Sequence, residues 1–422
     1  DGSGGLIQNI GGADMPDETP TASGVGTAIY LENVADIRIA NLQVQNTSNF
    51  GLRGFGVNGI TMNNVDFTGS HGNNAGADEG VFYVNNLTGT ATFTGGTYLG
   101  GIEDSVHIDN DGTSGTLTLA MSGMAITTGD GSNAAIGNNG ITIQASAGNV
   151  NGTISGNNFV AAVASHLQLV SSGTANYGLT IDNNTFTRHS GIVGNGGIGI
   201  LAGTQSSGLF NVTISNNNMA LLRSLNNAID VGSVNGPGTF AGTVDMTISG
   251  NTIGTIGNVG SGTAFNAIDV DGDGGGSSVY RITGNFIYDH DERGINVAAG
   301  EGAGASHQMS VLINNNIVQD NVSANDIQGI HVDSGVSSGS TPTICATITN
   351  NTVSNNANYI HGIRVRARNN GSLQIANGTG GAASEVAVET HLGGAAGNTV
   401  TQPIDAVLSG TGTLSFVTSC PN

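Results

Sequence analysis

The sequence predicts an all-β solenoid in which short parallel strands stack coil upon coil. Three observations favour this fold class. A hexapeptide with apolar ends recurs about every thirty residues, a second motif of alternating apolar residues precedes its copies, and the 70 Gly with abundant Asn and Thr suit no helix. A unit of this size cannot bury its own apolar face, whereas units stacked side by side can.

The hexapeptide has apolar first and last residues, Gly or Asn third and Asn fourth. Gly and Asn tolerate left-handed backbone angles, so the motif predicts a strand, a turn and a second strand. We expect the fourth-position Asn side chains to form an amide ladder and the first-position Ile side chains to form one buried stack. The copies are ISGNNF (154–159), IDNNTF (181–186), ISNNNM (214–219), ISGNTI (248–253), ITGNFI (282–287), INNNIV (313–318) and ITNNTV (348–353).

The second motif reads small-Ile-x-aliphatic, as in GITI (140–143), AIDV (228–231) and GIRV (362–365). A period of two residues gives a strand one inward and one outward face. Each coil is then predicted to hold three short strands, with about thirteen coils in all. The outward x positions form a predicted row: Thr142, Gln168, Gly199, Asp230, Asp269, Asn296, His331, Arg364 and Asp405.

These two motifs resemble the right-handed parallel β-helix of the pectin-lyase-like superfamily. The resemblance covers about residues 26–418. It is specific for the fold and not for a function, because that fold carries lyases, hydrolases, tailspikes and adhesins alike. We expect one β-helix domain over residues 26–422. Residues 1–25, which include Pro16 and Pro20, are interpreted as a cap, a linker or the end of another domain. No capping helix is expected at either end, and open ends invite end-to-end pairing.

The charge balance restricts the partners. The net charge is −21, and all nine cations are Arg, which argues against nucleic acid and anionic membrane surfaces and favours cations such as Ca²⁺. The sequence contains no run of 18 apolar residues, so membrane insertion is not expected. The chain begins at Asp1 without Met or a signal peptide. We therefore interpret it as part of a secreted protein, located outside the cell or on its surface.

A calcium site is predicted where Asp230 and Asp269 are neighbours in the outward row. Asp269 opens the segment DVDGDG, which continues with Asp271 and Asp273. Alternating Asp with interleaved Gly is typical of the start of a calcium loop, although Tyr280 stands where a full EF-hand loop has Glu. A solvated acidic loop is the alternative.

The resemblance also implies an enzymatic alternative. In enzymes of that superfamily the corresponding sheet commonly forms the floor of a saccharide groove. A lyase or hydrolase of acidic polysaccharide would use Asp230, Asp269, His331 and Arg364, with Ca²⁺ on the two carboxylates and Arg364 as the base. Against it, the chain lacks Lys, Trp and the hydrolase motifs Arg-x-Lys, Gly-His-Gly and Asp-Asp.

The segment GIRVRAR (362–368) places three Arg on one face. They are interpreted as cross-coil ion pairs, Arg366 with Asp333 and Arg364 with Asp405. A clamp for sugar carboxylates is the alternative, because Arg binds carboxylates bidentately.

Cys345 and Cys420 are expected two coils apart, about 10 Å. A disulfide needs Cα atoms within about 7 Å, so the bridge is predicted with the C-terminal tail folded back along the solenoid. Free thiols or a cross-link between subunits are the alternatives. The absence of a CxxC pair argues against a zinc or redox centre.

The leading hypothesis is a non-enzymatic extracellular solenoid that serves as a stalk, adhesin or filament subunit. Its expected partners are its own copies or a surface polysaccharide, with Ca²⁺ as a stabilising ion. A third hypothesis is ice binding by a row of Thr residues, which Arg281 and Leu312 interrupt.

Overall fold

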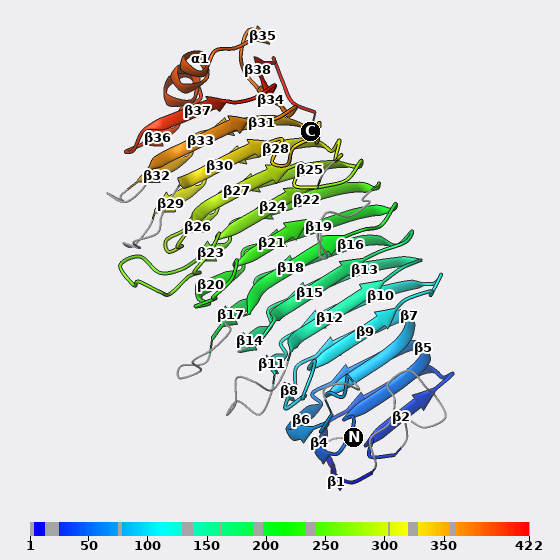
Figure 1. Ribbon diagram of the computed structural model, residues 1–422. Coiled ribbons are helices and arrows are strands. Elements are labelled where there is room, and N and C mark those ends of the chain that lie inside the picture. Colours follow the sequence, from blue (N-terminus) through cyan, green and yellow to red (C-terminus); the bar gives the residue numbers. More distant parts are fainter. Residues whose placement is uncertain are drawn as a thin grey trace. The chain divides into compact units, whose positions relative to one another are not determined.

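The protein is described by a computed structural model that covers residues 4–12, 25–74, 78–128, 138–160, 162–188, 197–232, 241–302, 304–319, 328–354 and 360–421. Pro16 and Pro20 lie outside these residues. The fold is an all-β parallel β-helix (Figure 1). The contacts divide the chain into two compact units, Asp1–Leu201 and Ala202–Asn422, and the boundary lies within strand β18.

Each coil repeats the same three steps, so the strands form three parallel ladders. The coil of β12 (Asn139–Ala145), β13 (Asn149–Ser155) and β14 (Asn158–Val160) shows the order. Ladder A contains the small-Ile-x-aliphatic strands, ladder B contains the strands that lead into the hexapeptide, and ladder C contains the strands that leave it. The described strands of ladder A number thirteen, which agrees with the predicted number of coils.

In the first unit, ladders A and B share two long strands, β5 (Leu52–Asn63) and β7 (Phe82–Thr94). Ladder A also contains β2 (Ile29–Glu32), β9 (Val106–Asn110), β12, β15 (Ser165–Ser171) and β18 (Ile198–Thr204). Ladder B also contains β3 (Ala35–Ala40), β10 (Thr116–Ser122), β13 and β16 (Asn176–Asp182). Ladder C contains β1 (Gly5–Ile10), β4 (Leu42–Thr47), β6 (Asp66–His71), β8 (Thr97–Leu99), β11 (Ala125–Thr127), β14 and β17 (Thr185–Thr187).

The second unit also contains strands of the three ladders. Ladder A contains β21 (Ile229–Gly232), β24 (Ile268–Gly272), β27 (Arg293–Ala299), β30 (Gln328–Ser334), β33 (His361–Ala367) and β37 (Ile404–Leu408). Ladder B contains β19 (Leu209–Ser215), β22 (Thr243–Ser249), β25 (Ser277–Thr283), β28 (Gln308–Asn314), β31 (Thr343–Thr349), β34 (Ser372–Ile375) and β38 (Thr413–Phe416). Ladder C contains β20 (Asn218–Leu221), β23 (Thr252–Ile253), β26 (Phe286–Ile287), β29 (Ile317–Gln319), β32 (Thr352–Ser354) and β36 (Thr399–Val400).

The hexapeptide forms the turn between ladders B and C, as predicted. Its third residue has a positive φ, for example 53° at Asn183 and 66° at Gly250, which is why only Gly or Asn occupies this position. The fourth-position Asn is buried and forms the predicted ladder. Asn251 Nδ2 donates to Asn285 Oδ1 at 3.0 Å and to the carbonyl of Ile214 at 3.0 Å, so the amide connects three coils.

The amide ladder extends one coil further than the hexapeptides indicated. Asn351 Nδ2 donates to Asn398 Oδ1 at 3.1 Å, and Asn398 Nδ2 donates to the carbonyl of Ile348 at 3.0 Å. Asn398 belongs to the segment AGNTV (396–400), which lacks the leading Ile and so was not recognised as a copy.

The predicted Ile stack is confirmed. All seven first-position Ile residues are at most 2% exposed. In register, Ile154 lies opposite Ile181 in the first unit, and Ile248 lies between Ile214 and Ile282 in the second. Phe side chains at the sixth position add a second stack, in which the rings of Phe159 and Phe186 lie 4.6 Å apart.

The N-terminal segment contributes a strand to the first unit. β1 pairs in parallel with β4, and Gly5 lies opposite Leu42. Residues 5–10 are therefore part of ladder C, although they carry no recognisable repeat.

The expectation that no helix caps the solenoid is wrong for the C-terminal end. Helix α1 (Glu385–Thr390) and a π-helical turn (His391–Ala395) lie beside β37, the last strand of ladder A (Figure 1). Glu389 Oε1 accepts from the backbone N–H of Ala406 at 3.1 Å, and Glu385 Oε1 accepts from that of Leu408 at 2.6 Å. These carboxylates satisfy donors that a further coil would otherwise have paired.

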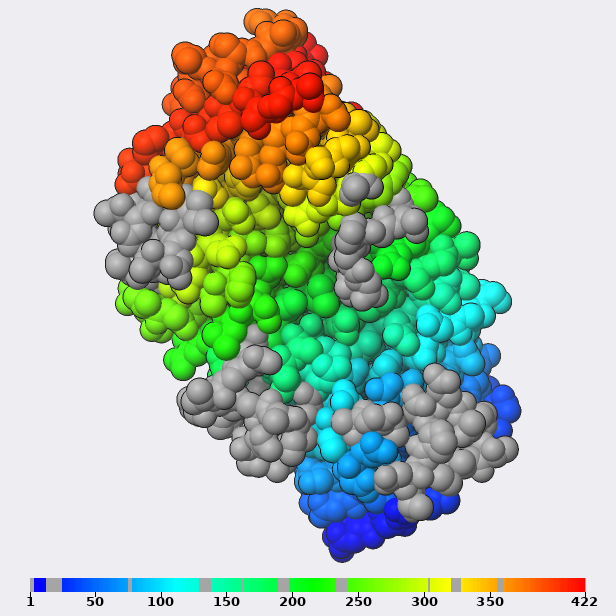
Figure 2. Space-filling model, in the orientation of Figure 1, coloured from blue at the N-terminus to red at the C-terminus, as the bar shows by residue number. Residues whose placement is uncertain are grey.

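The last strand of ladder B is also covered. β35 (Gly381–Ala382) pairs with β38 in the antiparallel direction, which ends the parallel stacking there. In Figure 2 the orange and red residues of this C-terminal segment lie over the yellow coils that precede them in the second unit. The sequence signal for the helix was a run without Gly from 382 to 392, with Ser384 as its N-cap.

Candidate functional site

The predicted outward row exists in the second unit with the predicted register. Each residue of the row lies on the strand next to its predecessor, and the row runs through Asp230, Asp269, Asn296, His331, Arg364 and Asp405. Adjacent strands of a sheet are about 4.8 Å apart. The candidate catalytic residues therefore follow one line and do not surround a common point. Asp230 and Asp269 lie on adjacent coils, Asn296 occupies the next coil, and His331 and Arg364 follow.

Asp230 and Asp269 are direct neighbours whose carboxylates share one amide. Asn227 Nδ2 donates to Asp230 Oδ2 at 3.0 Å and to Asp269 Oδ2 at 2.9 Å. Asp269 also accepts from Asn266 Nδ2 at 2.8 Å and from Asn296 Nδ2 at 2.7 Å. Burial, followed by the neighbouring charge of Asp269, raises the pKa of Asp230 to about 6. Three amides thus donate to Asp269, and one of them also donates to Asp230.

The residues predicted to bind calcium are arranged differently from a calcium loop. Asp273 Oδ1 accepts from the backbone N–H groups of Glu301 at 2.8 Å and Gly302 at 3.1 Å. Burial and the charge of Asp269 raise the pKa of Asp271 well above its usual range. Among the described residues, no three His, Cys, Asp or Glu side chains form a group that could hold a metal ion. The calcium site at Asp230, Asp269, Asp271 and Asp273 thus stays a prediction.

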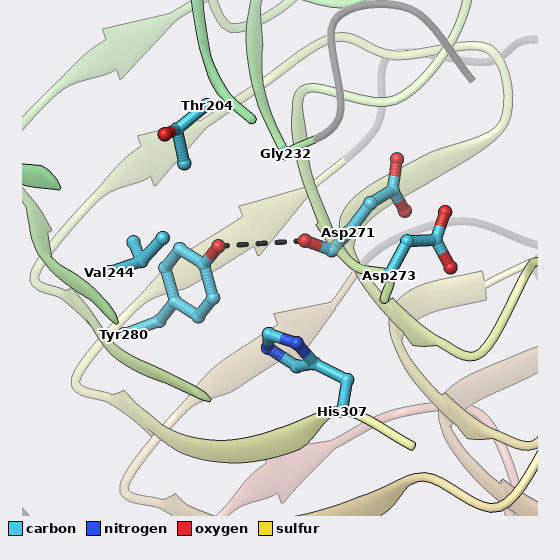
Figure 3. A pocket seen from close by; sticks show the side chains of 7 residues that line it. All are labelled: Thr204, Gly232, Val244, Asp271, Asp273, Tyr280 and His307. Carbon is cyan, nitrogen blue, oxygen red and sulfur yellow. Dashed lines mark hydrogen bonds between the residues drawn. The ribbon is translucent and has the colours of Figure 1, made fainter. Parts of the chain in front are cut away.

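A small pocket lies behind Asp271 and Asp273 (Figure 3). Tyr280 and His307 line it, and the Tyr280 hydroxyl donates to the Asp271 carbonyl at 3.5 Å while both Asp side chains turn away from the ring. Burial lowers the pKa of His307 to about 4, so the imidazole is neutral at pH 7. The cavity volume is about 20 Å³, which accommodates about one water molecule. The pocket is too small for a sugar ring.

Arg364 and Arg366 of β33 form the predicted cross-coil ion pairs, and Arg368 follows that strand. Arg364 Nε lies 3.0 Å from Asp405 Oδ2. Arg366 and Arg368 both bind Asp333, which is 2% exposed, and Arg368 Nε donates to Asp333 Oδ1 at 3.1 Å. The guanidinium groups are therefore occupied by carboxylates of the same chain.

His331 is held as a neutral side chain within this row. Its Nδ1 lies 2.9 Å from Asn296 Oδ1. Burial, followed by the positive charges of Arg293 and the Arg residues of β33, lowers the pKa of His331 well below its usual range. A neutral imidazole beside a guanidinium can accept or relay a proton. Here the imidazole contacts the Asn296 amide, which in turn donates to Asp269, so the ring is part of the hydrogen-bonded row.

The Thr row that suggested ice binding is interrupted as the sequence indicated. In the second unit Thr247 lies opposite Arg281, and Leu312 lies between Arg281 and Thr347. Arg281 pairs with Asp245. The face therefore presents charges and an apolar side chain among its hydroxyl groups.

Cys345 and Cys420 are joined by a disulfide with Cα atoms 5.5 Å apart. Cys345 has the outward parity of β31, and the tail covers it, leaving it 4% exposed. The hydroxyl of Ser310, one coil earlier, donates to the carbonyl of Pro421. The C-terminal tail therefore folds back along the solenoid.

The sequence reasoning missed the part of the outward row that lies before Thr142 in the first unit. There Arg53, Tyr83 and His107 occupy successive strands. The Arg53 guanidinium lies 4.0 Å from the ring centres of both Phe55 and Tyr83 and is completely buried. The signal was present in SVHI (105–108), a loose copy of the ladder A motif, but β5 and β7 carry no small-Ile-x-aliphatic sequence at this position.

Comparisons of this chain with known protein families, with characterised proteins and with solved structures found no match. Within the described part of the chain, no helix is long and apolar enough to cross a membrane.

Proposed function

We propose that this chain is a non-enzymatic extracellular solenoid with a structural or adhesive role at a cell surface or in a matrix. One observation carries the proposal: the outward row of the second unit, where the resembled superfamily has its saccharide groove, uses its charged groups on one another. Asp333 pairs with both Arg366 and Arg368, and Asp405 pairs with Arg364. Such pairs stiffen neighbouring coils and leave few charges for a substrate.

The C-terminal cap refines the predicted mode of assembly. Because Glu385, Glu389 and β35 occupy the edges of the last coil, we propose that this end does not pair with another copy. Self-association then uses another face of the molecule, or the chain is a stalk whose capped end is free.

Sedimentation velocity and negative-stain electron microscopy test this proposal. We expect single particles or lateral assemblies of them, and no change in an acidic polysaccharide such as polygalacturonate after long incubation with Ca²⁺. Release of unsaturated or reducing ends by the purified protein would overturn the non-enzymatic role. End-to-end filaments that persist would overturn the role assigned to the cap.

The second candidate function is cleavage of an acidic polysaccharide, and the Asp230–Asp269 pair favours it. Two neighbouring carboxylates, one of which has a raised pKa, are an arrangement that acid–base chemistry uses. Membership of the pectin-lyase-like superfamily is part of this candidate. If it is correct, Asp230→Asn and Asp269→Asn abolish cleavage, while the matched variant Asp245→Asn on ladder B retains it.

A further inference from the structure

The second unit carries an exposed apolar surface beside ladder C. Leu221 is the last residue of β20, Leu225 follows that strand, and Ile256, Val259 and Phe265 belong to the segment between β23 and β24. Each of the five residues is between 43% and 66% exposed. In Figure 1 the segment that follows β23 projects outward beside β20 and β26. We call these five residues the apolar patch.

Two neighbouring coils bring the members of the patch together. β20 pairs in parallel with β23, so Leu221 at the end of β20 lies beside the start of the segment that carries Ile256. A parallel bridge between Ser224 and Thr263 continues the contact of the two coils, and Leu225 follows directly after it. The five side chains therefore belong to one surface of the second unit.

Hydrogen bonds fix the shape of the segment that presents the patch. The backbone N–H of Thr255 donates to Ser261 Oγ at 2.8 Å, and the backbone N–H of Gly262 donates to Asp289 Oδ2, one coil further, at 2.8 Å. Aliphatic side chains on a segment held in this way stay in water unless a partner covers them, which is unfavourable. A fixed and contiguous apolar surface therefore indicates an interaction site.

The charge of this surface selects among the kinds of partner. Residues 218–228 and 252–267 contain no Asp or Glu, in a chain whose net charge is −21. The patch therefore offers no carboxylate to Ca²⁺, and the net charge opposes an anionic membrane. Four of its five side chains are aliphatic and offer a sugar neither a hydrogen-bond partner nor an aromatic ring. A second acidic copy of the chain is repelled least where carboxylates are absent.

Charged residues border the patch in an order that suits pairing about a two-fold axis. Bridges align Ser224, Thr263 and His290 on three successive coils. The exposed Arg223 therefore lies one coil before the patch segment, and Asp291 lies one coil after it. In a two-fold contact the coil before the segment in one copy faces the coil after it in the other. Each guanidinium then faces a carboxylate of the other copy.

We propose that the apolar patch is the contact through which two copies of this chain associate, patch to patch, about a two-fold axis. The inference rests on the proposed structural role and names the face that its self-association uses. A standard interface takes about 800 Å² from each partner, and five apolar side chains form only the centre of such an area. The dimer is therefore reversible and depends on protein concentration.

The test is sedimentation equilibrium of the whole chain over a range of concentrations, with and without a calcium chelator. Ile256→Ser combined with Val259→Ser should raise the dissociation constant of the dimer at least tenfold, because both side chains lose the gain from burial on association. The matched control is Val386→Ser, which changes a residue that is 69% exposed on α1 and outside the patch. It should leave the dissociation constant unchanged.

A second variant tests the two-fold geometry. The two Cys of the chain are joined to each other, so Val259→Cys introduces a single free thiol. In a patch-to-patch dimer the two new thiols face one another, and mild oxidation with copper phenanthroline should cross-link them. Val386→Cys, treated in the same way, should not be cross-linked.

Several results would overturn the inference. A dimer that is equally strong in the double Ser variant uses another surface, and a dimer that the chelator dissociates is held by Ca²⁺. A dimer in which Val259→Cys is not cross-linked contradicts the two-fold contact. Flotation with phosphatidylcholine vesicles that the double Ser variant loses would make a lipid surface the occupant. A chain that stays monomeric at every concentration and cleaves no polygalacturonate would reject the patch contact while leaving the structural role intact.

Discussion

The outward row of ladder A is built in two different ways in the two units. In the second unit it is a chain of carboxylates, amides and guanidinium groups that bind one another, from Asp230 to Asp405. In the first unit it is a column of rings around a buried cation, and it ends at polar atoms that bind no other described side chain. The same position on the same fold thus carries paired charges in the second unit, where Arg364 Nε still lacks a hydrogen-bond partner among the described residues, and stacked rings in the first.

This difference teaches that charge density is a poor guide to function in a solenoid. The second unit carries most of the residues that drew attention in the sequence, yet regular stacking places opposite charges one coil apart, where they neutralise one another. The first unit is less charged along this row, and several of its buried polar atoms lack a hydrogen-bond partner among the described residues.

The largest expected effect tests whether each unit has its own stacked Ile core, which the comparison requires. Ile248→Asp in the second unit and Ile154→Asp in the first bury a charge without a partner, so each should lower the free energy of unfolding by at least about 4 kcal/mol. Chemical denaturation followed by circular dichroism measures it. Ile248→Val is the control, with a loss of about 1 kcal/mol. An Asp variant as stable as the parent would contradict the stacked core.

The second prediction concerns the disulfide, which only the second unit has because the chain has two Cys. Cys345→Ser with Cys420→Ser should reduce stability by about 2–4 kcal/mol, since the bridge closes a loop across the sequence separation of 75 residues. Hydrogen exchange should increase in β34, β37 and β38 and stay unchanged in the first unit. Equal exchange in both proteins would show that the tail is held by other contacts.

The third prediction breaks the ion pairs of the second row. Asp333→Asn leaves Arg366 and Arg368 without their shared carboxylate, and because Asp333 is buried while the Arg side chains are 24% and 28% exposed, we expect a loss of about 2 kcal/mol. Asp405→Asn, at a more exposed pair, should cost less than about 1 kcal/mol. Thermal unfolding distinguishes the two, and equal effects would contradict the difference in burial.

The smallest expected effect is the pH dependence of one carboxyl in each unit. Burial raises the pKa of Asp230 in the folded chain to about 6, above its ordinary value of 3.8, so the folded state binds this proton more tightly. The resulting stabilisation is complete below pH 3.8 and is lost as the pH rises through 6. Burial raises the pKa of Glu103 in the first unit from 4.5 to about 7, so its stabilisation is complete below pH 4.5 and is lost as the pH rises through about 7.

The measurement compares melting temperatures between pH 4 and pH 8 for the parent, Asp230→Asn and Glu103→Gln. The difference in melting temperature between the parent and each variant should become smaller as the pH rises, because the parent loses the stabilisation from its protonated carboxyl. The comparison with the parent is needed because burial lowers the pKa of His71 and of His307 to about 4, which makes the whole chain less stable at low pH. A pH-independent difference for both variants would contradict the raised pKa values.

Much of the fold could be predicted because the repeat is local. Within one six-residue turn, Ile248 is buried, Gly250 adopts the positive φ and Asn251 joins the amide ladder. The alternation of apolar residues in AIDV is enough to place Asp230 on the outward face. The C-terminal helix could not be predicted in the same way, since a run of six helical residues is too short to show an apolar period.

The candidate site was predicted in its register but not in its chemistry. Sequence spacing placed Asp269, Asn296 and His331 in one line, and the ion pairs of Arg364 and Arg366 followed from the same spacing. Whether the Asp segment gathers around a cation depends on backbone N–H groups such as that of Glu301, which reaches Asp273 from the next coil. No local pattern specifies such a contact.

The sequence by itself determined the coil, because period-two strands and Gly or Asn at a left-handed position are local requirements of the backbone. It also determined which residues share a face. The tertiary structure alone decided which polar atoms are satisfied, since burial and hydrogen bonding depend on side chains about thirty residues away. Asp333 and Thr142 both lie on outward faces of ladder A, yet stacking surrounds the first with two cations and leaves the hydroxyl of the second without a described partner.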